Sequence, residues 1–345
     1  MNFFLENRSK PYLIAEAGVN HNGNVEIARN LTLAAAESGA DAIKFQMFHP
    51  EKLVIPSAQK AKYQVAATSE GTQLEMLRKL VLPDEAFIEL RELAKSVSID
   101  FIVTPFDSES AVFLANLVDF YKTGSGDLTF HKHLKLIASL KKPMLVSTGM
   151  ADLGTVERAV SEIRKVMGEN TENNLCLLHC TSSYPAPPES VNLRAIKTME
   201  TATGIKCGFS DHTQGIEIAL AAGSSGAHVI EKHFTLDKSL PGPDHRASIE
   251  PDELAALSKG LKKISKAMGT GIKIPVRDEQ NTAFAAKRSL VTPVKLKKGS
   301  VIDSGTLLAM RPGTGISPEY ADIINGMKIQ KDKEALDILT WDDFR

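Results

Sequence analysis

Two apolar runs in the sequence end in clusters of polar residues that include a histidine. CGFSDHTQG (207–215) contains His212, and VIEKHFT (229–235) contains His233. Two imidazoles at the same depth on neighbouring strands suit a divalent metal whose other coordination positions are left to water or substrate. The pattern therefore predicts a metal site at these histidines. The alternative is that each is an ordinary hydrogen-bonded core histidine.

Strand alternation assigns the neighbours of the histidines to faces. Side chains of equal parity share one face of a strand, so Ser210 lies beside His212. Glu231 lies beside His233 for the same reason. Asp211 points to the opposite face. We expect it either to orient His212 as a partner carboxylate or to cap the following helix.

Polar residues also stand late in other apolar runs. A buried lysine or carboxylate is costly without a partner, so these groups must meet one another or a ligand. Lys44 and Lys122 suit a doubly charged anion such as a phosphate, and TGSGD (123–127) adds backbone N–H groups. The sequence thus predicts a phosphorylated substrate; the alternative is that the lysines pair with Glu16 or Glu231. The late polar residues are Glu16, Lys44, Gln46, Thr104, Lys122, Ser125, Ser147 and His179.

The apolar runs alternate with helix-like segments. Near-continuous apolar strands separated by helices are typical of a parallel sheet that is covered on both faces. Eight such units predict a (β/α)8 TIM barrel, in which the carboxyl ends of the strands carry the active site. An open doubly wound sheet is the competing fold, but its usual Gly-x-Gly-x-x-Gly turn is missing. The eight runs span residues 12–18, 41–48, 100–106, 119–126, 143–150, 175–185, 206–213 and 229–235.

The periodic pattern stops near residue 270. We expect an α/β TIM-barrel domain over residues 1–270, a linker over 271–283 and a small β-rich domain over 284–345. The segment from 48 to 100 is too long for a single helix. It predicts an excursion over the barrel mouth, where long loops usually serve ligands.

The composition limits the possible partners. Of 345 residues, 41 are basic and 42 acidic, so the chain has almost no net charge. No long-range electrostatic attraction to nucleic acid or to an anionic membrane is therefore expected. No apolar stretch approaches the ~20 residues that span a bilayer. The N-terminal segment does not resemble a secretory signal. Three cysteines, an odd number, indicate a reducing, cytoplasmic compartment and buried structural thiols rather than a zinc site.

Several longer motifs resemble those of the sialic acid synthase family in order and spacing. They include IAEAGVNHNG, KFQMF, KTGSGD, FSDHT, IEKHFTLDKSLPGPDH and RPGTGISP, and the resemblance covers essentially the whole chain. It implies a TIM barrel followed by an antifreeze-like (SAF) domain. It also implies condensation of phosphoenolpyruvate with an N-acyl hexosamine and water, which gives a nine-carbon 2-keto acid and phosphate by C–O cleavage.

The resemblance implies roles for individual residues as well. His212 and His233 resemble the ligands of a divalent metal, usually Mn²⁺, with Mg²⁺ or Co²⁺ as substitutes. Glu16 resembles the carboxylate that lies beside the metal, and this carboxylate is the one that would accept or donate a proton. The implied catalytic set is Glu16, Lys44, Lys122 and Asp244. The implied substrate-binding set is Gln46, Thr104, Ser125, Asp127, Ser147, Tyr184, Ser210 and Arg311.

One of these residues has consequences for assembly. Arg311 resembles the arginine that the SAF domain of one subunit sends into the barrel of its partner, which implies a domain-swapped homodimer. The chain departs from the family pattern at two other positions. Asp127 stands where the family often has the longer Glu, and Ser182 stands where some members have Asn.

The motifs do not fix the acceptor sugar, and N-acetylmannosamine is the first candidate, with the two others as alternatives. N-acetylmannosamine would give N-acetylneuraminate, 2,4-diacetamido-2,4,6-trideoxymannose would give legionaminate, and an altrose isomer would give pseudaminate. GPDHRAS (242–248) looks more like the first two. Two other classes of protein are the alternatives: a non-catalytic sugar-binding protein, and a barrel aldolase with a Schiff base on Lys44 or Lys122, which borohydride would trap.

Overall fold

The structure is a computed structural model that describes residues 10–68 and 71–345. The chain divides into two compact units, Met1–Gly269 and Thr270–Arg345. Residues 1–9 lie outside the described part, so the lack of a secretory signal stays a prediction. Within the described part, no helix is long and apolar enough to cross a membrane.

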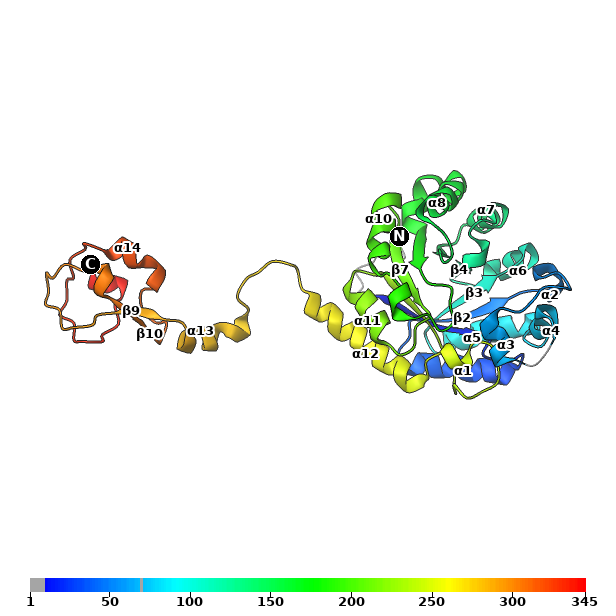
Figure 1. The fold of residues 1–345 in the computed structure, drawn as a ribbon, viewed down its shortest axis with the longest axis horizontal. Helices are drawn as coiled ribbons and strands as arrows, with labels where there is room; N and C mark the ends of the chain where they lie inside the picture. Colours follow the sequence, from blue (N-terminus) through cyan, green and yellow to red (C-terminus); the bar gives the residue numbers. More distant parts are fainter. Residues whose placement is uncertain (1–9, 69–70) are drawn as a thin grey trace. The chain divides into compact units, whose positions relative to one another are not determined.

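The first unit is a closed barrel of parallel strands, ringed by helices (Figure 1). The eight strands follow one another around the barrel in chain order, and β8 closes it by pairing with β1. This confirms the predicted TIM barrel and excludes the open sheet. The strands are β1 Tyr12–Gly18, β2 Ala42–Met47, β3 Asp100–Pro105, β4 Phe120–Thr123, β5 Met144–Ser147, β6 Leu175–His179, β7 Lys206–Asp211 and β8 Val229–His233.

Side-chain caps fix the starts of several barrel helices. The carboxylate of Asp152 accepts a hydrogen bond from the Thr155 amide at the start of α8, and Asn24 caps α1 through two amides. These caps satisfy amides that the first turn leaves without a partner. The longer helices are α1 Val25–Glu37, α5 Asp84–Ser96, α7 His131–Ser139, α8 Leu153–Met167, α10 Arg194–Thr203, α11 Glu217–Ser224 and α12 Pro251–Met268; α6 Ser108–Phe113 and α9 Thr171–Asn174 are shorter.

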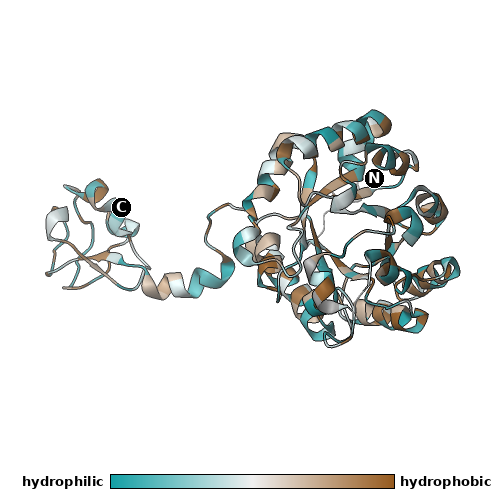
Figure 2. Ribbon diagram, turned by 45° about the vertical axis from the view of Figure 1, so that its right-hand side comes forward, coloured by the Kyte–Doolittle hydropathy of each residue, from teal (hydrophilic) through white to brown (hydrophobic). Residues whose placement is uncertain are grey.

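Two apolar layers follow from the alternation of the strands. Small and branched side chains such as Ile14 and Leu178 fill the barrel interior. The outward positions, such as Phe45 and Phe209, pack against the surrounding helices in a larger cluster. In Figure 2 these helices alternate between hydrophobic and hydrophilic residues, as expected for helices with one buried side. The interior layer lies beneath the polar ends of the strands.

The excursion between β2 and β3 has secondary structure of its own. Before α5 it forms the short helices α2 Pro50–Leu53, α3 Lys62–Ala67 and α4 Gln73–Arg78. Val19, Phe48 and Met76 belong to a separate apolar cluster beneath it. This cluster anchors the excursion beside the first two strands of the barrel.

The second unit has a small core made of Leu290, Ile302, Ile316 and neighbouring apolar residues. Within this unit, all of which the structure describes, only β9 Ser289–Val291 and β10 Leu308–Met310 pair as strands. Isolated bridges join its other extended segments. The alanine-rich helix α13 Gln280–Ala286 begins within the segment 271–283, whose role as a linker stays a prediction. The remaining helix is α14 Ala321–Ile324.

Gly208 tests the packing of the barrel beneath the histidines. A Cβ at this position would lie 2.5 Å from the Val229 carbonyl oxygen and 2.8 Å from Leu178 Cδ2. Gly208→Ala is expected to lower the free energy of unfolding by about 1–3 kcal/mol, because backbone atoms of β8 cannot yield easily. Urea unfolding measures it. Gly126→Ala is the control, since its Cβ would meet nothing within 4 Å; equal stability of the two variants would contradict the packing argument.

Candidate active site

A cavity of about 520 Å³ lies at the carboxyl ends of the barrel strands. The strand-borne residues predicted to be catalytic, substrate-binding or metal-binding all line it, whereas His179, also late in its strand, does not; residues of the excursion between β2 and β3 line it as well. Of the predicted set, only Asp127 and Arg311 are not part of its lining. The predicted residues that line it are Glu16, Lys44, Gln46, Thr104, Lys122, Ser125, Ser147, Tyr184, Ser210, His212, His233 and Asp244.

Four buried charged groups form the floor of the cavity. Lys44 Nζ lies 2.6 Å from Glu16 Oε2 and 3.7 Å from Glu231 Oε2. Lys122 Nζ lies 3.3 Å from Glu231 Oε1. All four side chains are at most 5% exposed. The ion pairs that the sequence left as the alternative role of the lysines are therefore present in the structure.

Burial and charge act in opposite directions on these groups. Burial raises the pKa of Glu231, but the attraction of Lys122 and Lys44 outweighs it and lowers the value to about 2. Burial likewise raises the pKa of Glu16, and here Lys44 does not fully offset it. Burial disfavours the charged form of Lys44, yet the two carboxylates raise its pKa, so it stays an ammonium. For Lys122, burial outweighs the attraction of Glu231 and lowers the pKa.

The two histidines face one another across the ends of β7 and β8. Their ring centroids are 5.5 Å apart. His212 Nδ1 donates a hydrogen bond of 2.7 Å to the Thr181 carbonyl oxygen, which leaves Nε2 as the acceptor nitrogen. His233 Nδ1 is buried and has no hydrogen-bond partner within residues 10–68 and 71–345. Ser210 Oγ lies 3.4 Å from His212 Nε2, a long contact that a ligand could replace, so each ring can offer one nitrogen to a ligand.

These rings fit a metal site with open positions. Burial lowers the pKa of both His212 and His233 to about 3, so both are neutral and can act as ligands near neutral pH. No group of three or more His, Cys, Asp or Glu side chains in the described part of the chain is arranged to hold a metal.

Asp211 does neither of the two things expected from the sequence. The Nδ1 atom of His212 is bonded to a backbone carbonyl and not to this carboxylate. Asp211 Oδ1 accepts the Thr213 amide four residues before α11 begins at Glu217, so it is not a helix cap. It lies on the outer face of β7, where it forms a buried ion pair with Lys232.

An aromatic and polar wall stands above the histidines. The Tyr184 ring centroid is 4.2 Å from that of His212 and 5.0 Å from that of Tyr63, which belongs to the excursion. Gln46 Nε2 donates to Glu16 Oε1 at 3.0 Å. Asp244 follows β8, and burial raises the pKa of its carboxyl to about 7. This side of the cavity offers stacking surfaces and hydrogen-bonding groups.

Small hydroxyls surround the two lysines. Thr104 Oγ1 lies 3.4 Å from Lys44 Nζ. Ser125 Oγ accepts the Gly149 amide at 3.1 Å and lies 3.2 Å from Cys180 Sγ. Asp127 Oδ2 is buried without a hydrogen-bond partner among the described residues, behind this hydroxyl-rich end. The combination of ammonium groups and hydroxyls suits an oxyanion.

Several lining residues were not among the predicted site residues, and Glu231 and Tyr63 matter most for the chemistry. Glu231 lies between both lysines; parity had placed it beside His233 and as a possible partner of the lysines, but not in the catalytic set. Tyr63 had no comparable signal, because the sequence of an excursion does not show which side chains turn inward. Arg311 belongs to the second unit, where it is exposed, so its predicted role stays a prediction.

The cysteines and His179 lie outside this chemistry. All three cysteines are free and buried, as predicted for structural thiols. His179 is on the outer face of β6, where Nε2 donates to the Val191 carbonyl oxygen at 2.6 Å. It is therefore a hydrogen-bonded structural histidine.

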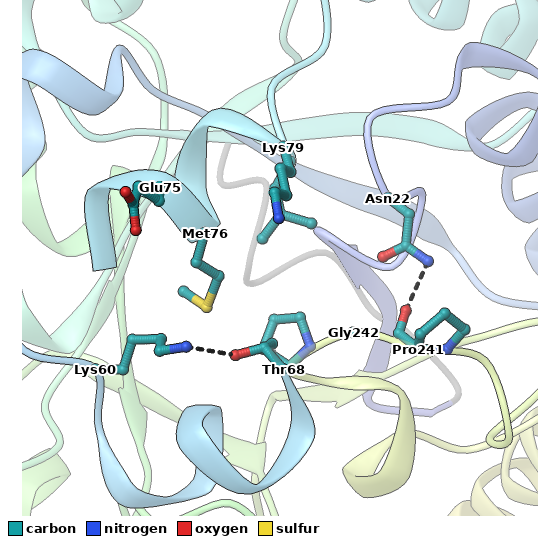
Figure 3. A pocket seen from close by; sticks show the side chains of 10 residues that line it. Asn22, Lys60, Thr68, Glu75, Met76, Lys79, Pro241 and Gly242 are labelled. Atoms are coloured by element: carbon teal, nitrogen blue, oxygen red, sulfur yellow. Dashed lines mark hydrogen bonds between the residues drawn. The ribbon is translucent and has the colours of Figure 1, made fainter. Parts of the chain in front are cut away.

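A second hollow of about 610 Å³ adjoins the cavity (Figure 3). Met76, Leu80 and Pro243 line both spaces, so the two are neighbours. Lys60 and Lys79 also line the hollow. The hollow extends the site away from the histidines.

A closed parallel barrel with titratable groups at the carboxyl ends of its strands is the architecture of TIM-barrel enzymes. The NeuB family model matches residues 31–273, and the SAF domain model matches residues 287–345. The chain is an enzyme of the NeuB family, with a C-terminal SAF domain. This agrees with the resemblance stated from the motifs.

Named relatives cover nearly the whole chain. An N,N'-diacetyllegionaminic acid synthase of Campylobacter jejuni is 44% identical over 94% of this chain and 98% of its own. One of Legionella pneumophila is 43% identical over 96% and 94%. The N-acetylneuraminate-9-phosphate synthase of Homo sapiens is 34% identical over 91% and 86%. The crystal structure of N-acetylneuraminic acid synthetase from Leptospira borgpetersenii, in complex with citrate, has a TM-score of 0.70 at 33% identity, covering 81% of this chain and 93% of that chain.

The histidine pair gives a direct prediction. His212→Ala and His233→Ala are each expected to abolish turnover and to weaken Mn²⁺ binding by at least about a hundredfold, since loss of a mere outer partner costs 10–100-fold. Calorimetric titration of the metal measures the affinity. His179→Ala is the matched control and should bind the metal like the wild type. Wild-type affinity in either site variant would refute the ligand assignment.

Proposed function

We propose that the protein condenses phosphoenolpyruvate with an N-acyl hexosamine and water, forming a nine-carbon 2-keto acid and phosphate. One observation carries the proposal: two buried lysines share a buried carboxylate beside two neutral histidines. A phosphorylated, carboxylated substrate would use the ammonium groups, and an aldehyde would use the neighbouring electrophilic site. A binding protein needs no such combination.

The lysines bind and orient phosphoenolpyruvate. Lys44 and Lys122 are at present balanced by Glu16 and Glu231, so an entering dianion competes with those carboxylates for the ammonium groups. Ser125 and Ser147 add hydroxyl donors at the same end. Fixed cations are expected to stabilise the phosphate as negative charge builds up on it during departure.

The other substrate is placed against the histidines. His212 and His233 would hold the divalent metal, Mn²⁺ in the first instance, which supplies Lewis acidity for an aldehyde oxygen when bound. Tyr184 and Gln46 are positioned to orient the open-chain sugar. C3 of phosphoenolpyruvate forms the new bond to the aldehyde carbon. Water then adds at C2, and the C2–O bond to phosphate breaks.

Glu16 handles the proton in this scheme. Burial raises the pKa of its carboxyl above the usual value, which brings it nearer to the range in which a general acid–base group exchanges a proton. Its Oε2 atom lies 2.6 Å from Lys44 Nζ, and its Oε1 atom accepts from Gln46. An entering anion that draws Lys44 away from this carboxylate would leave Oε2 open to a proton. Asp244, with a pKa raised to about 7 by burial, is a second group able to hydrogen-bond the sugar in either protonation state.

The Schiff-base alternative is less well supported at Lys44. Two carboxylates raise the pKa of this lysine and keep it protonated, whereas a Schiff base needs the neutral amine. Lys122, whose pKa is lowered by burial, is the residue at which borohydride trapping tests that mechanism.

The names of the relatives bear on which acceptor sugar is favoured. N-acetylmannosamine was the first candidate from the motifs, but the two relatives at 44% and 43% identity are N,N'-diacetyllegionaminic acid synthases. We therefore favour 2,4-diacetamido-2,4,6-trideoxymannose. The hollow beside Met76 and Pro243 offers room for the additional acylamino group.

A comparison of acceptors tests this choice. With Mn²⁺ and phosphoenolpyruvate, kcat/KM for the diacetamido sugar is expected to exceed that for N-acetylmannosamine by about tenfold or more, the order of effect that one substituent in a fitted pocket gives. Phosphate release is the measurement. Equal or faster turnover of N-acetylmannosamine would contradict the acceptor, and no release with any acceptor would contradict the condensation itself.

Lys79 provides a variant for the same experiment. It lines the hollow but not the cavity at the histidines, and its side chain is exposed. Lys79→Trp should lower kcat/KM for the diacetamido sugar and leave that for N-acetylmannosamine unchanged. An equal loss with both sugars would show that the hollow does not receive the added group.

We also propose a domain-swapped homodimer in which Arg311 reaches the barrel of the partner. Arg311→Ala is then expected to raise the KM for the sugar far more than the KM for phosphoenolpyruvate. Co-refolding of Arg311→Ala with His212→Ala gives a sharper test, because a swapped heterodimer has one barrel with both intact residues. Recovered turnover at low sugar concentration is expected; none would be recovered if each Arg311 served its own barrel.

A further inference from the structure

A fully buried ion pair lies on the outer side of the two strands that carry the histidines. Lys232 Nζ is 2.8 Å from Asp211 Oδ2, and both side chains are 0% exposed. The two residues are direct neighbours in the register of β7 and β8. Neither lines the cavity, and the proposed chemistry uses neither of them.

The surroundings make this pair unusual. The other outward positions near it, Phe209, Ile230 and Phe234, belong to the apolar cluster between the barrel and its helices. Apolar residues would fill this place at no electrostatic cost, whereas buried charges lose their hydration. Packing alone therefore does not account for an ion pair here.

The pair holds the backbone beside His212. Asp211 Oδ1 accepts a hydrogen bond of 2.8 Å from the Thr213 amide, and Lys232 Nζ donates one of 2.5 Å to the Thr213 carbonyl oxygen. Asp211 directly precedes His212, so the histidine stands between two residues that are fixed by the pair.

The same contacts lie where the regular sheet stops. The pairing of β7 with β8 ends at Asp211 and Lys232, and His212 and His233 each come one residue later. No further rung of this ladder sets the distance between the two imidazoles. The ion pair directly precedes the two histidines, and its hydrogen bonds to Thr213 fix the residue that follows His212.

We propose that the Asp211–Lys232 pair is a positioning device that sets the separation of the two histidines and so the affinity of the site for a divalent metal. The inference rests on the proposed metal-binding role of His212 and His233. Neither residue of the pair contacts the ion in this account. Both act through the backbone.

Direct metal titration of the full-length protein tests the proposal. Asp211→Asn and Lys232→Met are each expected to weaken Mn²⁺ binding by about tenfold or more, as loss of outer partners does elsewhere. Thermal unfolding is measured on the same samples. Wild-type Mn²⁺ affinity in folded Asp211→Asn protein would overturn the proposal.

A second ion pair supplies the matched control. Asp119 accepts two hydrogen bonds from Arg91, at 2.9 and 3.0 Å, and one from the Phe101 amide, but it lies before β4, at the opposite end of the barrel strands. Asp119→Asn should lower the unfolding temperature and leave the Mn²⁺ affinity within about twofold, because no histidine depends on it. Equal weakening in this variant would show that lost stability alone lowers the affinity, which would overturn the positioning role.

The double variant Asp211→Leu/Lys232→Met separates stability from positioning. Replacing a buried pair by apolar residues often restores stability, yet Thr213 would still lack both side-chain partners. The expected result is a recovered unfolding temperature with Mn²⁺ binding still weak. Recovered affinity would overturn the proposal.

His212→Ala distinguishes failure of this inference from failure of the proposed function. If His212→Ala binds Mn²⁺ like the wild type, the metal assignment itself is wrong. If His212→Ala loses Mn²⁺ while Asp211→Asn keeps it, only the positioning role is wrong.

Discussion

The structure depends on the confinement of charge to one end of an apolar barrel. Two ammonium groups and two carboxylates lie at the carboxyl ends of the strands with almost no exposure to solvent. They are tolerable there because each opposes another, and because the apolar layer below them excludes water without offering partners of its own. The positive and negative charges are balanced, and an entering anion can replace a carboxylate as the partner of an ammonium group.

Neutral histidines complete the division of the cavity. Burial keeps the imidazoles uncharged, so they do not compete with the lysines for an anion. The lysine end attracts phosphate and carboxylate groups, whereas the histidine end, walled by Tyr184 and Tyr63, suits a polar uncharged partner. Two substrates of different character can thus be held side by side in one space.

Strand periodicity predicted which side chains of the strands face the barrel mouth, but no such period shows which side chains of the excursion do. Parity placed Lys44, Ser210 and His233 inside the barrel mouth, because a period of two leaves no freedom once one face is buried. Tyr63 could not be predicted, since an irregular excursion carries no such period. Asp211 was assigned to the correct face but to the wrong partner, because the Thr181 carbonyl that holds His212 comes from a loop distant in sequence.

That loop ties the His212 residue at two points. Its ring is bonded to the Thr181 carbonyl oxygen, and its own carbonyl oxygen accepts the amide of Ala186 at 2.8 Å. The segment after β6 is therefore bonded to both the ring and the backbone of this residue. An insertion between Thr181 and Ala186 would therefore disturb one or both of these bonds and with them the orientation of the ring. The excursion near Tyr63 contributes no hydrogen bond of this kind to His212 among the described residues.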